Sequence, residues 1–419
     1  MVDVTIIGGG IIGVMTAWEL ARRGRKVLIC EKGRVAAEQS SRNWGWIRQQ
    51  DRDYAELPIM MESLQIWNGL NSKLREEIGF RQRGITYLAR NAEKLRAYET
   101  WLDGARAYGV DTRMLSMRET QAMLPNAAGG WVGAMTTPSD AMAEPFLAVP
   151  ALARAASQDG VMIRENCAAR ALEITNGRLQ GVITEKGHVK CDRVVVAAGA
   201  WSSLFLKPHN IQLPQLSVLS SVMQTEPVAE FFNAAAGDGR FAFRHRADGG
   251  YTLSPWEEHD FFIGPDAFRN FFAYLPTLRQ EFSSTHFRLA APQNYPDAWQ
   301  TPRRWHADEK TPFENCRILN PKPSRKTLER VLALFSKAFP KIGRPKIQNS
   351  WGGMIDTMPD ILPVVDHAHI SGLTIATGMS GHGFGIGPGM GKVTADLVEE
   401  QKPAHALEAF ALKRFKNPK

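Results

Sequence analysis

VDVTIIGGGIIGVMTAWELARRGRKVLICE, residues 2–31, is the stretch of the chain that decides its fold. The apolar run Val2–Ile7 predicts a short buried strand, and Ile11–Arg23 predicts a helix that ends at Gly24. Lys26–Glu31 predicts a second strand. Strand, glycine turn, helix and strand in about 30 residues make one βαβ unit. The N-terminal end of the chain therefore predicts a Rossmann-type dinucleotide-binding domain.

The turn in this unit carries three glycines, Gly8, Gly10 and Gly13, in the pattern G-x-G-x-x-G. The first permits the tight turn, the second lets the backbone approach a pyrophosphate, and the third lets the helix pack against the strand. The amides of Ile11 and Ile12 at the start of the helix face the anion. We expect all five residues to contact the cofactor.

An acidic residue at the end of the second strand narrows the choice of cofactor. Glu31 can accept hydrogen bonds from ribose hydroxyls, and its charge disfavours the 2′-phosphate of NADP. Lys32, the next residue, is expected in the same site. The pattern does not distinguish FAD from NAD, so an NAD-dependent dehydrogenase stays open from these residues alone.

Size and composition describe an ordinary globular protein of about two domains. The chain has 419 residues, of which 44% are hydrophobic and 22% charged, and a net charge of +8. Its basic residues are spread along the chain without interleaved aromatics, which argues against nucleic acid as a partner. A weak peripheral contact with anionic membrane surfaces stays open.

The four cysteines form no CxxC pair and no cluster with histidine, so we expect neither a structural zinc site nor a disulfide framework. No other metal site is predicted. We see no cleavable signal and no apolar run near the roughly 20 residues of a membrane span. The sequence therefore predicts a cytoplasmic protein without a transmembrane segment.

Changes of pattern along the chain predict two interleaved domains, an α/β one and a β-rich one. The predicted fold class is a discontinuous Rossmann-type dinucleotide-binding domain with a second, α+β substrate domain built on an antiparallel sheet. We assign 1–83, 140–214 and 350–419 to the first domain, and 84–139 and 215–349 to the second. Predicted helices include residues 54–82 and the segment from Gly391 to Glu400.

Three further segments carry a family resemblance. They are VVVAAGAWS at 194–202, WGGMIDTMPDILP at 351–363 and GLTIATGMSGHGFGIGPGMG at 372–391. With the N-terminal glycine pattern, these motifs resemble the glycine oxidase and D-amino acid oxidase family of flavoproteins, which includes sarcosine oxidase-like proteins. The motifs follow the family's order over nearly the whole chain. The resemblance implies FAD as the cofactor and an oxidoreductase that acts on an amino acid or amine.

The resemblance also implies which further residues contact FAD. Small polar residues after the second strand touch the flavin phosphates in this family, and glycines near the C-terminus let backbone amides approach the ring. Sarcosine oxidase-like relatives tether FAD through a cysteine where this chain has Gly353, so non-covalent FAD is expected. The candidates are Ser40, Ser41, Arg42, Trp44, Gly45, Ala198, Gly199, Trp201, Gly353, Gly381, His382, Gly383, Phe384 and Gly385. Trp44 and its neighbour Trp46 fit core packing equally well.

Residues for substrate binding are less well defined by the sequence. An α-carboxylate is best held by an arginine fork, and glycine oxidase-like proteins typically carry that arginine before the PD-x-x-P stretch. This chain has none there, so Arg48 and Arg244 are the replacement candidates, with structural roles equally open. Asp356 is a candidate partner for an amine or a cap of a turn. No side chain is assigned as a catalytic base.

The expected reaction is oxidation of a C–N bond by hydride transfer to flavin, with a D-amino acid as the favoured substrate. The imine then hydrolyses to a 2-oxo acid and ammonia. A secondary amine such as an N-methyl amino acid, an L-amino acid, and a non-catalytic dinucleotide-binding scaffold remain alternatives. Reoxidation by dioxygen or by a quinone or other carrier is equally open.

Overall fold

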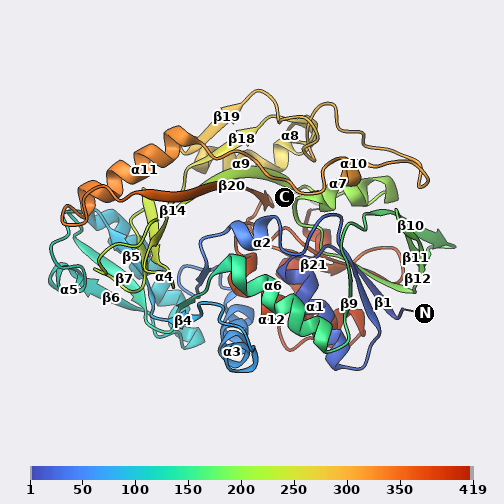
Figure 1. Cartoon of the computed structure of the whole chain (residues 1–419), viewed down its shortest axis with the longest axis horizontal. Helices are drawn as coiled ribbons and strands as arrows, with labels where there is room; N and C mark the ends of the chain where they lie inside the picture. Colours follow the sequence, from blue (N-terminus) through green and yellow to red (C-terminus); the bar gives the residue numbers. More distant parts are fainter. Residues whose placement is uncertain (1, 416–419) are drawn as a thin grey trace.

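The computed structural model describes residues 2–415 and contains two large sheets (Figure 1). The first has six strands in the order β21-β22-β13-β1-β2-β9. Five of them are parallel neighbours, and only β21 runs antiparallel. Their bounds are β1 Val4–Ile7, β2 Val27–Cys30, β9 Met162–Arg164, β13 Arg193–Val196, β21 Val364–His367 and β22 Leu373–Thr377. These strands confirm the predicted βαβ unit and draw on both ends of the chain.

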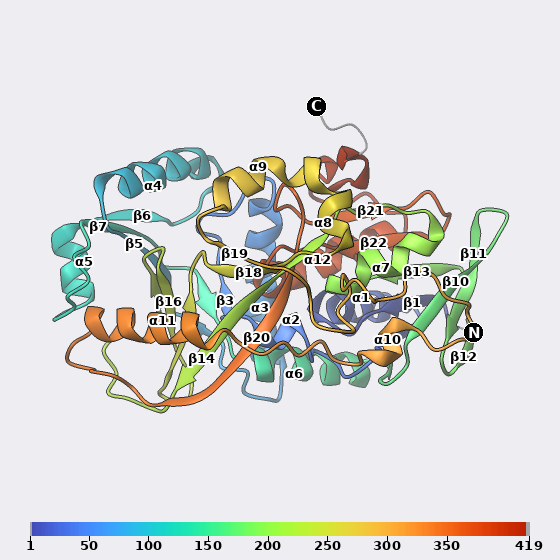
Figure 2. The ribbon, with the colours of Figure 1, turned by 90° about the horizontal axis from the view of Figure 1, so that it is seen from above.

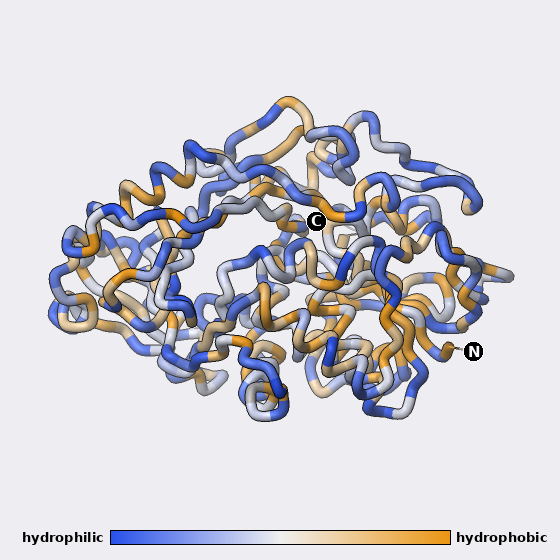
Figure 3. Tube along the Cα trace, in the orientation of Figure 1, coloured by the Kyte–Doolittle hydropathy of each residue, from blue (hydrophilic) through white to orange (hydrophobic). Residues whose placement is uncertain are grey.

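Helices α1 (Ile11–Arg22), α12 (Gly383–Val398), α6 (Pro145–Gln158) and α3 (Leu57–Lys73) pack on one another beside this sheet (Figure 1). Apolar side chains of these helices cover the strands, so the strand sequences are continuous hydrophobic runs. Figure 3 shows these strands in orange near the N-terminus. The helix expected over 54–82 is shorter, because the chain turns out of α3 after Lys73 and pairs as strand β4 (Arg81–Gln82).

The C-terminal helix begins earlier than the sequence predicts, at Gly383 instead of Gly391. Its glycines serve close packing: an added Cβ would lie 2.8 Å from Ile11 at Gly387 and 2.5 Å from Met15 at Gly391. Glycine lowers helix propensity, so the run predicts a loop, but the close contact with α1 stabilises the helix.

The second sheet has ten strands, in the order β19-β18-β14-β17-β16-β15-β5-β7-β6, with β20 paired to β14. We expected an antiparallel sheet, and the observed one is mixed, because β5 with β15 and β18 with β19 are parallel. Helices α4 (Ala92–Ala105) and α11 (Arg325–Ala338) pack on it. Its strands are β5 Ile85–Ala89, β6 Arg113–Ser116, β7 Gly133–Thr137, β14 Leu216–Thr225, β15 Ala235–Gly237, β16 Phe241–His245, β17 Tyr251–Pro255, β18 His259–Phe262, β19 Thr285–Arg288 and β20 Ile347–Thr357.

Strand β20 connects the two sheets (Figure 2). It pairs with β14 in ten registered positions, from Thr357 opposite Leu216 to Ile347 opposite Thr225. The expected boundary between 349 and 350 thus falls inside this strand, because one continuous strand begins at the far side of the second sheet and ends beside the first.

Smaller elements complete the fold. Two three-stranded antiparallel sheets accompany the two large ones. These elements are α2 Gln39–Arg42, β3 Trp46–Ile47, α5 Met117–Met123, β8 Ala141–Met142, β10 Ala169–Thr175, β11 Arg178–Thr184, β12 Gly187–Lys190, α7 Ser202–Leu206, α8 Pro265–Arg269, α9 Phe271–Glu281 and α10 Pro312–Asn315. No helix within residues 2–415 is long and apolar enough to cross a membrane.

Candidate active site

A cleft of about 380 Å³ lies between the two sheets. One wall is formed by the carboxyl ends of β1, β2 and β13 and by the starts of α1 and α12. The opposite wall comes from β14 and β20 of the second sheet. Ligands of open α/β sheets bind outside the carboxyl ends of their strands, so this cleft is the candidate active site.

The glycine turn after β1 permits the close approaches that its pattern predicts. Gly8 has φ +111°, and an added Cβ would lie 2.3 Å from the carbonyl oxygen of Ala197. At Gly13 the added atom would lie 2.1 Å from the Gly8 oxygen, so this glycine packs helix against turn and does not line the cleft. Gly10 does line it, beside Ser40.

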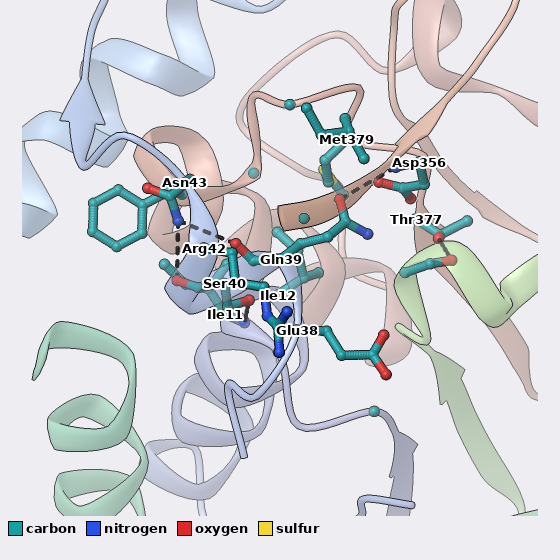
Figure 4. Close-up of a pocket in the computed structure, with 18 of the residues that line it drawn as sticks. Ile11, Ile12, Glu38, Gln39, Ser40, Arg42, Asn43, Asp356, Thr377 and Met379 are labelled. Atoms are coloured by element: carbon teal, nitrogen blue, oxygen red, sulfur yellow. Dashed lines mark hydrogen bonds between the residues drawn. The ribbon is translucent and has the colours of Figure 1, made fainter. Parts of the chain in front are cut away.

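Short helix α2 places a hydroxyl at the start of α1. The Ile11 N–H donates to Ser40 Oγ at 2.9 Å, as Figure 4 shows, and the Ser40 O–H stays free to donate to a phosphate oxygen. Ser41 does not line the cleft, which corrects its assignment to the cofactor. It is on the opposite side of the helical turn, and its hydroxyl faces the Glu38 carbonyl.

Glu31 closes the nucleotide end of the cleft. Its carboxylate accepts hydrogen bonds from the N–H groups of Gly9 and Gly33, both at 2.7 Å. Burial raises the pKa of Glu31, although these two amides lower it. Lys32 also lines the cleft, where its Nζ lies 4.4 Å from the centre of the Trp201 ring.

Glu38 is a residue of this end that the sequence analysis missed. Its carboxylate accepts hydrogen bonds from Lys32 Nζ at 2.6 Å, Trp201 Nε1 at 3.1 Å and the Leu319 N–H at 2.8 Å. It thereby joins α2 to the turn after β13, where Ala198, Gly199 and Trp201 line the cleft as predicted. No local pattern distinguishes Glu38 from a solvated acid.

The C-terminal part of β20 lines the centre of the cleft with Gly353 and Asp356. The Asp356 carboxylate is fully buried and accepts from the Gly378 N–H at 2.9 Å and from Gln215 Nε2 at 3.0 Å. Its N–H donates to Gln39 Oε1, a second missed residue that is visible beside Asp356 in Figure 4. Burial raises the pKa of Asp356. These bonds make it a brace between β20 and β22.

The start of α12 brings Gly381, His382, Gly383 and Phe384 to the cleft. Gly385 does not line it, because it lies one turn into the helix, where its carbonyl accepts hydrogen bonds from Ser63 and Trp67. The resemblance placed it at the ring because the run was expected to be a loop.

His382 forms a buried pair with Glu56, with Nδ1 and Oε2 2.9 Å apart. Burial lowers the pKa of His382 to about 4, helped by the nearby Arg52 guanidinium. His382 is therefore neutral at physiological pH. Burial raises the pKa of Glu56, but His382 and Arg52 outweigh it, and the net shift is downward.

Arg244, a candidate substrate clamp, does not line the cleft. Its guanidinium donates to both carboxylate oxygens of Glu144 at 2.8 Å and to the Trp44 carbonyl at 2.7 Å. Gly45 is also away from the cleft, because an added Cβ there would lie 2.9 Å from Arg244 Nε. Both residues belong to the packing beneath the cleft.

The substrate end of the cleft contains Arg48, Arg52, Trp44, Trp46 and Trp256. The Arg48 guanidinium lies 5.7 Å from the centre of the Tyr87 ring and donates to the carbonyls of Gln50 and Asp51. Arg52, which the sequence analysis missed, is 3% exposed and has a buried nitrogen without a partner among the described residues. No group of three or more His, Cys, Asp or Glu within residues 2–415 is arranged to hold a metal.

The model of the DAO family, described as FAD dependent oxidoreductase, matches residues 3–397. The chain belongs to this family. DAO proteins are flavoproteins, and the cleft fits FAD: the glycine turn permits close approach, the Ser40 hydroxyl and the amides at the start of α1 would hold the phosphates, and Glu31 would hold the ribose. Binding is non-covalent, as is typical of the family, and Gly353 offers no side chain for attachment.

Individual relatives in the DAO family act on different amines. The beta subunit of sarcosine oxidase from Rhodobacter capsulatus is 25% identical over 99% of this chain and 88% of its own length. Glycine oxidase from Geobacillus kaustophilus is 26% identical over 98% of this chain and 97% of its own. The solved structure of L-amino acid deaminase from Proteus myxofaciens with anthranilate has a TM-score of 0.94 and 31% identity, covering 99% of this chain and 94% of the other. This chain is an FAD-dependent amino acid or amine oxidoreductase.

Proposed function

We propose that this DAO protein oxidises the Cα–N bond of an α-amino acid, with the L-enantiomer as substrate, to an imine that hydrolyses to a 2-oxo acid and ammonia. The observation that supports this choice is the 31% identity, over 99% of the chain, to an L-amino acid deaminase. The D-amino acid favoured by the motifs alone stays a prediction that the same experiment tests.

Bound FAD would supply a two-electron acceptor for a hydride from the substrate α-carbon. The residues of the chain bind, orient and desolvate the substrate. A neutral amine is needed for hydride release. Glu56 is not placed to hold an ammonium, because its carboxylate is buried and paired with His382. The apolar side chains of Ile355 and Met379 line the middle of the cleft and exclude water.

Two sets of segments in the chain have different proposed roles, one in cofactor binding and one in covering the substrate. We propose that residues 1–83, 140–214 and 350–419 hold FAD, and that 84–139 and 215–349 cover the substrate. The two walls of the cleft, one from each large sheet, support this division. The electron acceptor, dioxygen or a quinone or other carrier, and cytoplasmic location stay predictions.

An anaerobic titration tests the proposed function. The purified yellow enzyme is mixed with paired L- and D-amino acids and with their N-methyl derivatives, and bleaching of the flavin band near 450 nm (roughly) is followed. We expect the L-amino acids to bleach it fastest. Faster bleaching by D-amino acids or by N-methyl derivatives would assign the protein to the alternative substrate class. Air or a soluble quinone is then added to identify the acceptor.

A further inference from the structure

Three buried side-chain polar atoms within residues 2–415 have no hydrogen-bond partner: Trp46 Nε1, Gln50 Nε2 and Arg52 Nη1. All three are N–H donors, and all three lie in one seven-residue segment. Leaving a buried donor unpaired costs about 1–3 kcal/mol, and more for a charged group. Two of these donors, Trp46 Nε1 and Arg52 Nη1, belong to residues that line the cleft, whereas Gln50 does not line it, so an acceptor ligand in the cleft can complete the first two.

Arg52 is the charged member of this set, and it lines the cleft. Its Nε donates to the Arg48 carbonyl at 3.3 Å, which fixes the guanidinium against the turn that carries it. Trp101 Nε1 donates to the Arg52 carbonyl at 2.8 Å and holds the backbone of the same turn. The free Nη1 is therefore held in place before any ligand binds.

The other arginines at or beneath the cleft already donate hydrogen bonds to protein groups or are exposed to solvent. Arg42 donates to Asn320 Oδ1 at 2.6 Å and to two carbonyls, and Arg48 donates to two carbonyls. Arg34 lines the nucleotide end and is exposed to solvent. Arg244 is committed to Glu144 beneath the cleft. Arg52 alone combines burial with an open donor.

The charges around Arg52 also favour an anion. Two guanidinium groups, those of Arg48 and Arg52, face Glu56, whose carboxylate is bound to neutral His382. Asp51 and Asp140 are the other acids that act on this pair. Burial raises the pKa of both carboxyl groups, that of Asp140 to about 7, so the negative charge of Asp140 is incomplete at neutral pH. A bound carboxylate would balance the remaining positive charge.

Trp46 supplies the second open donor that lines the cleft. Its ring is held in an edge-on contact with Trp44, with centroids 5.2 Å apart, and in another with Trp256 at 5.6 Å. These contacts fix the direction of its N–H. A carboxylate has two oxygens and can accept from both an indole and a guanidinium.

We propose that Arg52 and the Trp46 indole N–H bind the substrate carboxylate, in place of the arginine that this chain lacks before its PD-x-x-P stretch. The proposal rests on the proposed function, because it takes the ligand to be an amino acid. It assigns Arg52 a binding role and leaves Arg48 to support the turn.

The test measures ligand binding without turnover. The oxidised FAD-bound enzyme is titrated with 2-aminobenzoate and with 2-aminobenzamide, which has the same ring and amine but no charge. The change in the flavin spectrum gives each Kd. We expect Arg52→Met to weaken 2-aminobenzoate about 10- to 100-fold and to leave 2-aminobenzamide unchanged. Trp46→Phe keeps the ring and should weaken 2-aminobenzoate about 2- to 10-fold.

Control variants keep the result interpretable. Arg279→Met removes an exposed arginine on α9 and should change neither Kd. Arg52→Lys keeps the charge without the fork, so it should retain part of the affinity even if Arg52→Met does not fold. Unchanged 2-aminobenzoate binding in Arg52→Met, equal weakening of both ligands, or loss of FAD affinity with carboxylate selectivity retained would overturn the proposal. Absence of 2-aminobenzoate binding to the unaltered enzyme would do so as well.

The two proposals fail in different ways. If no amino acid bleaches the flavin but Arg52→Met still weakens 2-aminobenzoate selectively, the proposed function is wrong and the carboxylate site stands. If amino acids bleach the flavin and Arg52→Met does not change the preference for 2-aminobenzoate over 2-aminobenzamide, the proposed function stands and the carboxylate site is wrong.

Discussion

At its nucleotide end the cleft exposes backbone at three glycines, beside charged side chains such as Glu31 and Lys32, whereas at its substrate end its wall is formed by large charged and aromatic side chains. Gly8, Gly10 and Gly199 leave amides and carbonyls exposed to the ligand at the first end. Arg52 and the tryptophans stand at the second. Backbone contacts suit a ligand that is the same throughout a family, and side chains can change with the substrate. The predictions below test this contrast.

The largest effect is expected at the backbone wall. Gly8→Ala places a Cβ 2.3 Å from the Ala197 carbonyl oxygen at φ +111°, so the turn must move and FAD binding should be abolished. The measurement is flavin absorbance per chain in the purified protein. Gly24→Ala is the matched control, since it also has positive φ but meets nothing within 4 Å. It should cost about 1 kcal/mol of stability and retain FAD. Full FAD content in Gly8→Ala would contradict the contrast.

The second prediction concerns the packing beneath the substrate end. Arg244→Met leaves the Glu144 carboxylate buried without its partner and should lower the free energy of unfolding by about 3–5 kcal/mol. Urea unfolding of the holoenzyme measures it. Arg246→Met removes a more distant neighbour of Glu144, at 3.7 Å, and should cost less. A variant of normal stability that no longer binds 2-aminobenzoate would restore Arg244 as the clamp.

A smaller change is expected at Glu31. Glu31→Gln removes the charge that orders the Gly9 and Gly33 amides, and it replaces one acceptor oxygen by a donor. We expect FAD to bind about 10-fold more weakly, with the Kd for 2-aminobenzoate of the reconstituted enzyme unchanged. Titration of the apoprotein with FAD measures the first quantity. An altered 2-aminobenzoate Kd would show that the two ends of the cleft are coupled.

The smallest effect is a pH dependence set by His382. Its pKa is about 6.5 in the unfolded chain and about 4 in the folded one, so acidification protonates the unfolded state first. The contribution of neutral His382 to the free energy of unfolding is complete above pH ~6.5 and is lost as the pH falls through about 4. At pH ~5 the loss should reach about 1–2 kcal/mol. His382→Gln should show a flatter decline between pH ~7 and ~5 in thermal unfolding. Parallel curves for both proteins would contradict this assignment.

The contrast also explains which parts were predictable. The βαβ unit depends on local pattern, so strands β1 and β2 and helix α1 follow from thirty residues. The start of α12 does not, because only its contact with α1 offsets the low helix propensity of Gly385 and Gly387. At the nucleotide end, Gly8 and Gly10 were predicted from glycine spacing, Ser40, Ala198, Gly199 and Trp201 were predicted from the family resemblance, and Glu38 was not predicted.

Residues at the substrate end could not be assigned from sequence for a physical reason. Residue type alone does not distinguish Arg48, Arg52 and Arg244. Their roles differ because the fold brings different hydrogen-bond acceptors to each guanidinium. Glu144 lies 100 positions from Arg244 along the chain, and His382 lies 326 positions from Glu56. The one local signal was the spacing of Arg52 four residues before Glu56, which would place opposite charges near each other on a helical turn. This spacing does not show which of the two side chains faces a cavity.

Strand β20 has a consequence for how molecules enter and leave. It pairs with β14 in ten positions, and both strands lead to the first sheet along the chain, since β14 follows β13 and β20 precedes β21. The two connections between the sheets are thus held side by side, so a hinge opening of the molecule would have to bend this paired ladder. We expect ligand exchange to depend on local movements at the mouth of the cleft, while the two large sheets keep their arrangement.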